Sequence, residues 1–214
     1  MDWSVLRDSS GAFGLGLLVT LEVSILALLL ALALGVVIAT LRAVPNRILR
    51  GIGATYVEVL RNIPLLVQLF FVYFALPSIG IRFDAFTCGV LALGIYTSAF
   101  VAEAIRSGIA GVPKGQLEAG LSSGMSYATA MRLIVLPQAI TRTIPPLGNQ
   151  ALNLIKNSSL VSTISVLDVL GTANLLDSRS FQFVPMLVGA AICYLILTLP
   201  TALGVNLLEK RFAR

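Results

Sequence analysis

The chain has 214 residues, of which 57% are apolar and 12% are charged, and its mean hydropathy is +0.93. Soluble domains carry about a quarter charged residues, so this composition excludes an ordinary soluble domain. The formal net charge of +5 is not gathered into a basic stripe with interleaved aromatic residues, so it does not indicate a nucleic-acid partner.

Five apolar stretches are each about as long as a helix must be to cross ~30 Å of hydrocarbon. In chain order they cover residues 23–41, 62–81, 85–102, 133–155 and 180–208. The fourth contains a single charged residue, Arg142, and the others contain none. The start, MDWSVLRDSS, lacks the basic region of a signal peptide, so the first stretch is expected to remain as a span. These stretches predict an all-α polytopic membrane protein with five transmembrane helices.

Lysine and arginine are distributed unequally between the two sets of loops that five spans create. Nine fall in one set: Arg42, Arg47, Arg50, Arg106, Lys114, Arg132, Lys210, Arg211 and Arg214. Four fall in the other: Arg7, Arg82, Lys156 and Arg179. Because cytoplasmic loops are enriched in Lys and Arg, we expect the N-terminus outside and the C-terminus in the cytoplasm. The polar segment between the third and fourth spans, about residues 111–137, then lies on the cytoplasmic side.

Polar or charged side chains inside or at the ends of the predicted spans mark a candidate path for a solute. They are Arg61, Gln68, Glu103, Arg142, Asn149 and Asn153. Such groups are costly in hydrocarbon, so they tend to face the bundle interior or a water-filled cavity. For Arg61 and for Arg106, one helical turn from Glu103, the alternative is a side chain that reaches back to the interface. The fourth span favours a cavity, because its several polar groups cannot all reach the headgroups.

Breaks are expected within and after the fourth span. Pro137, Pro145 and Pro146 free backbone carbonyls there and should interrupt the helix. After the span, apolar residues at helical spacing predict a short amphipathic helix over about residues 158–170 on the outer side, either re-entrant or lying on the surface. Ser158 is the expected N-cap of that helix, and Gly171 is its expected end.

The polar segment before the fourth span carries its own helix signals. Pro113 suits the first turn of a helix, and Gly124 is a helix stop. Ser126 then predicts the cap of a second helix that leads into the membrane. The small residues Ala119 and Gly120 would let another surface approach closely, so the segment is a candidate protein-binding element. The alternative is an ordinary amphipathic loop helix that rests on lipid headgroups.

No catalytic or metal site is predicted in this chain. The string Gly120-Leu121-Ser122-Ser123-Gly124 matches the G-x-S-x-G nucleophile elbow, but that elbow needs a strand–turn–helix setting and a histidine base. The chain contains no histidine. It also lacks a Walker A string and a cluster of metal ligands, so it has no ATPase site of its own.

Several motifs, in order along the chain, resemble those of one transporter family. Glu118-Ala119-Gly120, then Gly124, then nine residues, then Ile134-x-Leu136-Pro137 resembles the coupling-loop pattern E-A-A-x3-G-x9-I-x-L-P of ABC importer permeases. The one departure is Gly120 for the second alanine, which lowers helix propensity by about 1 kcal/mol, so the helix is expected to rely on a docking partner for order. The strings GLLVTLE (16–22), RNIPLLVQ (61–68), AEAIRSGI (102–109) and KNSSLVS (156–162) extend the resemblance, to the polar amino acid branch, over about residues 14–212.

The resemblance implies a single transmembrane permease domain over residues 1–214 in a bacterial inner membrane. It implies a second permease subunit, identical or paralogous, two cytoplasmic ATPase subunits and an extracytoplasmic amino-acid-binding protein as partners. The residues expected to contact the ATPase subunits are Lys114, Gly115, Gln116, Glu118, Ala119, Gly120 and Gly124. The chain itself would be a transporter subunit and not an enzyme, and it would bind no cofactor, because ATP and Mg²⁺ are used by the ATPase subunits.

The form RNIPLLVQLFF resembles permeases for acidic or broadly polar amino acids, so glutamate or aspartate is the expected substrate. A cationic Arg61 or Arg142 near the path would suit a carboxylate. The alternatives are an ion-coupled secondary carrier and a non-transporting membrane scaffold. Secondary carriers usually have more spans and internal repeats than this chain offers, and a scaffold leaves the polar fourth span without a use.

Overall fold

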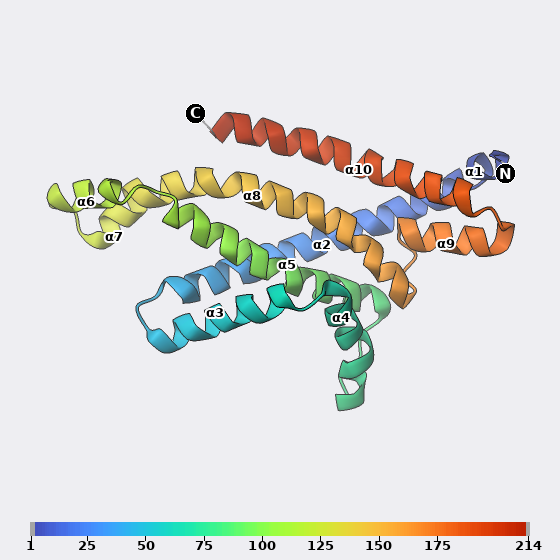
Figure 1. Ribbon diagram of the computed structural model, residues 1–214, viewed down its shortest axis with the longest axis horizontal. Coiled ribbons are helices and arrows are strands. Elements are labelled where there is room, and N and C mark those ends of the chain that lie inside the picture. Colours follow the sequence, from blue (N-terminus) through green and yellow to red (C-terminus); the bar gives the residue numbers. More distant parts are fainter. Residues whose placement is uncertain (1–2, 213–214) are drawn as a thin grey trace.

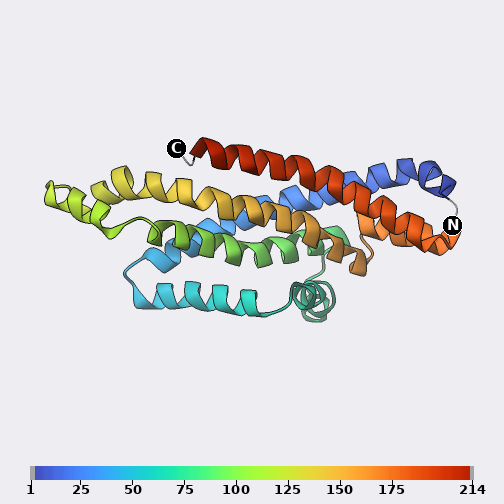
Figure 2. The same ribbon diagram turned by 45° about the horizontal axis from the view of Figure 1, so that its top comes forward.

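The computed structural model describes residues 3–212, and every regular element in that range is helical (Figure 1). The longest helices run side by side: α2 (Ser10–Ala43), α5 (Ala85–Ala110), α8 (Leu136–Asn157) and α10 (Phe183–Phe212). The shorter α-helices are α1 (Ser4–Asp8), α3 (Arg47–Asn62), α4 (Leu65–Phe70), α6 (Lys114–Ser122), α7 (Tyr127–Ala130) and α9 (Val169–Ser180). Helices α6 and α7 lie at one end of the bundle, and α1 and α9 lie at the other (Figures 1 and 2). The predicted all-α fold is confirmed for the described residues.

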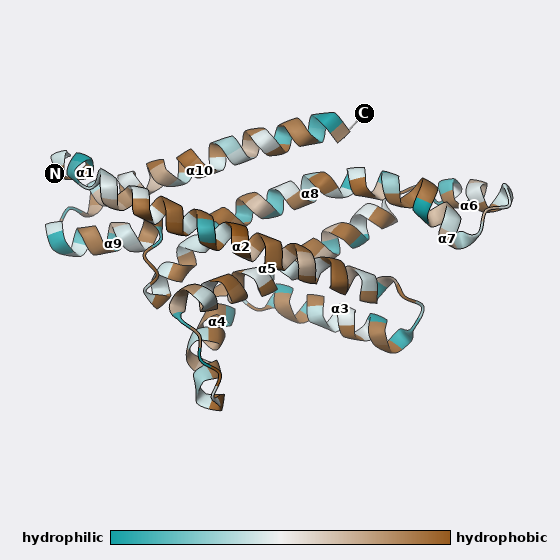
Figure 3. Cartoon of the chain, turned by 180° about the vertical axis from the view of Figure 1, so that it is seen from behind, coloured by the Kyte–Doolittle hydropathy of each residue, from teal (hydrophilic) through white to brown (hydrophobic). Residues whose placement is uncertain are grey.

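Three helices are each long and apolar enough to cross a membrane: Ser10–Ala43, Ala85–Ala110 and Phe183–Phe212. Two further candidates are bent pairs, Arg47–Asn62 with Leu65–Ile79 at 104° and Tyr127–Ile164 with Val169–Ser180 at 44°. The number of spans is therefore three to five, and a polytopic helical membrane protein is confirmed. Figure 3 shows the apolar character as a nearly continuous brown colour along α2.

The second predicted span, 62–81, is not one straight helix. Helix α3 ends at Asn62, and Ile63 and Pro64 are both extended (φ −99°, ψ 130° and φ −55°, ψ 136°). Proline disfavours a helical conformation in the residue before it and has no N–H to continue the ladder, so the chain turns here. The following residues, Leu65–Ile79, form a lateral arm of α4, a π-helical turn and a 3₁₀ turn. In Figure 2 this arm is seen end-on as a ring while α3 lies across the view.

Local caps return the chain from the lateral arm to α5. Gly80 has a φ of +89°, the left-handed conformation that glycine adopts without strain, and it ends the 3₁₀ turn. Asp84 then caps α5: its carboxylate accepts hydrogen bonds from the Thr87 N–H (3.1 Å) and the Thr87 hydroxyl (2.6 Å). These hydrogen bonds, first that of the Thr87 side chain, lower the pKa of the Asp84 carboxyl.

The predicted breaks at Pro137, Pro145 and Pro146 are wrong, because the helix continues through all three. Pro145 and Pro146 lie inside α8, and Pro137 lies in its first turn, where a missing N–H is tolerated. A wider π-helical turn, Met131–Val135, comes directly before Pro137 and joins α7 to α8. The departure from regular α-helix in the fourth predicted span therefore lies in this π-helical turn and not at the prolines.

The helix predicted over 158–170 is also misplaced. Residues Ser158–Ile164 continue α8 as a 3₁₀ turn, and Ser165 (φ 68°) ends it. Ser158 caps nothing: it is buried, and its hydroxyl donates to the Ile155 carbonyl (2.7 Å). Asp168 is the N-cap of α9, and Gly171 lies in the first turn of that helix with its N–H bonded to the Asp168 carboxylate. The start of α9 is therefore set by its N-cap, Asp168, and not by the spacing of the apolar residues.

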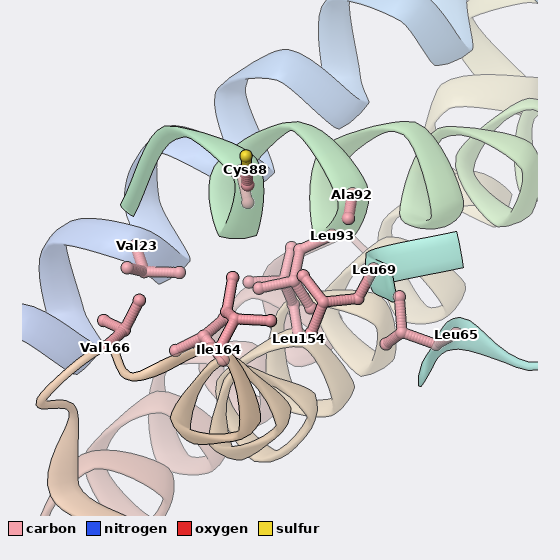
Figure 4. Packing of buried hydrophobic residues seen from close by; sticks show 11 residues of the cluster. Val23, Leu65, Leu69, Cys88, Ala92, Leu93, Leu154, Ile164 and Val166 are labelled. Carbon is pink, nitrogen blue, oxygen red and sulfur yellow. The ribbon is translucent and has the colours of Figure 1, made fainter. Parts of the chain in front are cut away.

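The core joins elements from the whole length of the chain. Its largest buried cluster brings Val23 of α2, Leu69 of the lateral arm, Leu93 of α5 and Leu154 of α8 together around Ile164 (Figure 4). Glycines allow the closest helix contacts, since a Cβ on Gly35 of α2 would collide with Val101 of α5. The lateral arm is thus fixed at its base by the same core that holds the long helices together.

Candidate functional site

The polar segment 111–137 forms a helix–turn–helix at one end of the bundle (Figure 1). Pro113 is extended (φ −57°, ψ 132°) and occupies the N-cap position directly before α6. Gly124 has a φ of +83° and ends that helix, as predicted. Ser126 then caps α7, with its hydroxyl accepting a hydrogen bond from the Thr129 N–H (3.2 Å), also as predicted. The predicted helix, turn and second helix are confirmed, except that Pro113 precedes the first turn of α6 and does not lie in it.

Helix α6 presents an outward surface that mixes polar side chains with the small residues Gly115 and Ala119. Its exposed predicted contact residues are Lys114, Gly115, Gln116, Glu118 and Ala119, and Gly124 is exposed just after the helix. Leu117 is half-buried and packs against a small cluster that contains Val112, Val135 and Ala139. One side of α6 is therefore anchored to the membrane helices, and the other is free to meet a partner.

Gly120 is predicted to contact a partner together with Glu118 and Ala119, but it does not share their outward face. It is buried, and a Cβ placed on it would lie 2.8 Å from Ile134 Cδ1 and 3.1 Å from Ala130 Cβ. The close approach that glycine allows is thus to α7 and the π-helical turn of the same chain. These contacts within the chain supply order to α6.

Substitutions of Gly120 with alanine and with leucine are expected to differ sharply in their effect on the free energy of unfolding. Gly120→Ala should change the free energy of unfolding by less than about 1 kcal/mol, because the gain in helix propensity offsets a small shift of the Ile134 side-chain end. Gly120→Leu should cost roughly 1–3 kcal/mol through overpacking and should tilt α6. Thermal unfolding of the purified variants measures the difference. Equal unfolding temperatures for the two variants would contradict the packing seen here.

Helix α8 carries a stripe of polar side chains on its open side. Arg142, Asn149, Asn153 and Lys156 are all exposed in the single chain. At 3.6 residues per turn these four positions lie within about 60° of one another around the helix. The structure therefore brings together three of the predicted path residues and adds Lys156 to them.

The other predicted path residues lie at the bend and near the α6 end of the bundle. Arg61 is exposed, with its guanidinium carbon 5.2 Å from the centre of the Phe100 ring, a cation–π geometry. The Gln68 amide donates to the carbonyls of Leu60 (2.8 Å) and Ile63 (3.0 Å). Gln68 therefore satisfies backbone groups that Pro64 leaves free, and it belongs to the bend.

Glu103 holds two arginines near the α6 end of the bundle. Its carboxylate accepts a hydrogen bond from Arg42 Nη1 of α2 (2.7 Å) and from Arg106 Nε (3.1 Å) and Nη2 on its own helix. Arg106, one helical turn from Glu103, thus lies on the same face of α5 and pairs with it. The link to Arg42 ties α2 to α5 at this point.

Sequence reasoning missed a buried polar network at the opposite end. Asp168 is 0% exposed and accepts hydrogen bonds from the Gly171 N–H (2.8 Å) and the Tyr194 hydroxyl (2.9 Å). The Thr20 hydroxyl of α2 accepts from the Val169 N–H (3.1 Å). An aspartate directly before a helix start was the available signal. Glu22 was also missed as a polar residue in a span, and it is exposed on α2.

Between residues 3 and 212 no group of three or more His, Cys, Asp or Glu residues could hold a metal ion. The G-x-S-x-G string lies at the end of α6, in a helix and turn, and so lacks the strand of a nucleophile elbow. The arrangement instead combines an exposed helix, α6, with a polar stripe on α8, which belongs to a candidate span.

The description "binding-protein-dependent transport system inner membrane component" names a protein family that matches residues 31–214. The chain belongs to this family. The probable glutamine ABC transporter permease protein GlnM of Bacillus subtilis is 47% identical over 214 residues, covering 100% of this chain and 99% of that protein. The probable glutamine ABC transporter permease protein GlnP of the same species is 37% identical over 199 residues, covering 92% of this chain and 91% of that protein.

Two solved structures have the same fold as this family member. A chain in the crystal structure of an amino acid ABC transporter with histidines gives a TM-score of 0.95 at 36% identity, with 99% of both chains covered. A chain of the inward-facing MetNI methionine ABC transporter gives a TM-score of 0.82 at 15% identity, which shows a common fold alone. These likenesses confirm the predicted resemblance to ABC importer permeases and the role of a transporter subunit as opposed to an enzyme. The roles of individual residues stay predictions.

Proposed function

We propose that this chain is the membrane-spanning subunit of an ATP-driven importer for a polar amino acid, with glutamine as the first candidate substrate. Two permease subunits, identical or paralogous, enclose the path, and two cytoplasmic ATPase subunits use ATP and Mg²⁺. An extracytoplasmic binding protein delivers the amino acid. The chain crosses a bacterial inner membrane five times, with its N-terminus outside. The proposal is supported by likeness over the whole chain to permeases named for glutamine.

The observation that carries the path assignment is the exposed polar stripe of α8. Arg142, Asn149, Asn153 and Lys156 lie on a helix within a candidate membrane span, yet all four are exposed, and nothing among residues 3–212 covers them. Polar groups at membrane depth face a wet cavity or another protein chain, because hydrocarbon cannot solvate them. A second permease subunit placed opposite this stripe would enclose a polar path between the two copies of α8.

The fold offers a direct route from the docking helix to that path. Helix α6 packs through Gly120 on Ala130 and Ile134, which belong to α7 and to the π-helical turn before α8. The backbone then continues into the helix that carries the polar stripe. Movement of an ATPase subunit that holds α6 would therefore tilt α8, and the path would alternate between its two openings as a rigid-body switch.

Substrate choice is the finer part of the proposal. The path residues include the cations Arg142 and Lys156, which suit the carboxylate common to all amino acids. Glutamate and aspartate, expected from the sequence, remain candidates, but the names of the relatives favour glutamine. Uptake of labelled glutamine, glutamate and lysine in cells that lack their own transporters for these amino acids tests the choice. Uptake of lysine alone would contradict it.

A matched pair of variants tests the path itself. Asn153→Leu removes a stripe residue and is expected to lower uptake strongly, whereas Ile140→Leu changes an exposed apolar residue of the same helix and should leave uptake unchanged. Equal uptake by both variants would contradict the path assignment. Uptake that persists after the ATPase subunit is inactivated would indicate an ion-coupled carrier and overturn the importer proposal.

A further inference from the structure

We propose that a groove between α2, α5 and α8 binds one anionic phospholipid at the end of the bundle that carries α6. The groove consists of two adjoining cavities of about 450 Å³ and about 280 Å³, which share Ala39, Ala43, Ile109 and Met131 in their walls. The larger cavity is apolar, and the smaller one adds Arg42, Arg106 and Tyr127. The inference is independent of the substrate and requires only that the chain lies in a membrane.

The larger cavity has the wall chemistry of a site for a hydrocarbon chain. Val36, Ile105, Ile140 and Leu147 are among its lining residues. Its two threonines offer no free O–H donor, because Thr40 donates to the Val36 carbonyl (2.8 Å) and Thr143 donates to the Ala139 carbonyl (2.7 Å). The cavity therefore excludes polar ligands and accepts an apolar one.

The length of the groove matches one leaflet of a bilayer. Along α8 its wall extends from Leu136 to Leu147, which is roughly 16 Å at 1.5 Å per residue. Half of a hydrocarbon core of about 30 Å is about 15 Å. An acyl chain laid along the groove would thus reach from the arginines toward the middle of the membrane.

The polar end of the groove carries an excess of positive charge. Arg42 and Arg106 line the smaller cavity, and Glu103, bonded to both, neutralises only one of them. The side chain of Arg106 is 49% exposed. Its bonds to Glu103 use Nε and Nη2, and a guanidinium has five N–H donors, so donors remain for a phosphate. Basic pockets between membrane helices select acidic lipid headgroups in this way.

The rim of the groove favours lipid over a folded protein as the occupant. Val36 and Ile140 line the larger cavity and are also exposed, and both are aliphatic side chains on helices that belong to candidate spans. A surface of this kind is solvated by acyl chains, and the single net charge sits where the apolar wall ends. Charge and apolar depth together fit phosphatidylglycerol better than the zwitterionic phosphatidylcholine.

Competition between these two lipids tests the proposal. The purified full-length chain is stripped of lipid with detergent and given equal amounts of dioleoyl phosphatidylglycerol and dioleoyl phosphatidylcholine, and native mass spectrometry counts the bound molecules. Wild type should retain phosphatidylglycerol preferentially. Arg106→Gln should lower that preference by a factor of about five, the contribution of one basic residue near an anionic surface. Arg106→Lys should keep most of it.

Two further variants separate the groove from general charge and from misfolding. Arg50→Gln removes an exposed arginine of α3 that does not line the groove, and the lipid preference should not change. Thr40→Trp fills the larger cavity from an exposed position and should lower retention of both lipids, so it reads the site even if Arg106→Gln fails to fold. Equal retention of the two lipids by wild type, or equal effects of Arg50→Gln and Arg106→Gln, would overturn the proposal. The proposal would also be overturned if Thr40→Trp left lipid retention unchanged but abolished copurification of an ATP-binding protein. That result would assign the groove to a protein contact.

Discussion

Replacement of Glu118 with arginine is expected to uncouple the permease from its ATPase partner while leaving the membrane helices folded. Glu118 is exposed on α6, next to the exposed Ala119, and no hydrogen bond or ion pair within the described chain depends on its side chain. A reversed charge at a docking surface places like charges together, which costs several kcal/mol. Copurification of the ATPase subunit should therefore fall by about tenfold or more, since tenfold in affinity corresponds to about 1.4 kcal/mol.

The measurement is ATP hydrolysis by the reconstituted complex with and without substrate-loaded binding protein, together with the amount of ATPase subunit that copurifies. Glu209→Arg, the same reversal near the end of α10, is the matched control and should retain both. Glu118→Gln should lower copurification of the ATPase subunit by an intermediate amount. Copurification unchanged by Glu118→Arg would remove α6 from the ATPase interface.

The parts of the candidate site that were predicted from the sequence are those set by short-range backbone chemistry. Gly124 adopts a positive φ and Ser126 caps the next helix, and both properties depend on residues within one turn. The inward position of Gly120 was not predictable in the same way. It depends on Ile134, which is brought beside it only after the chain has reversed direction.

Hydropathy located the membrane segments but not their directions. The residues 62–81 are uncharged, so they were predicted as one span, yet Pro64 forces a 104° change of direction near the start. Gln68 was assigned to the path because it is polar in an apolar run. Its bonds to Leu60 and Ile63 show that such a residue can satisfy the backbone at a bend. A polar residue in a span can thus line a path or satisfy the backbone at a bend, and only the surrounding structure shows which of the two it does.

Removal of the Asp168 side chain is expected to be the most destabilising single truncation in the network that joins α2, α9 and α10. Asp168→Ala deletes the N-cap of α9, which costs about 0.5–2 kcal/mol. It also leaves the half-buried Tyr194 hydroxyl without its carboxylate partner, a further loss of about 1–3 kcal/mol. The sum, roughly 1.5–5 kcal/mol, should appear as a clear fall in thermal stability of the purified chain.

The readout uses two cysteines that the fold protects. Cys88 and Cys193 are free and only 1% and 6% exposed, so a thiol-reactive fluorophore should report unfolding as they become accessible. Asp177→Ala, the same change on the same helix outside the network, should shift the transition little. Tyr194→Phe should cost only about 0.6–1.7 kcal/mol, the range for one hydrogen bond between membrane helices. If Asp168→Ala were no worse than Tyr194→Phe, the cap of α9 would contribute nothing. The polar contribution of Asp168 would then come from its hydrogen bond with Tyr194 alone.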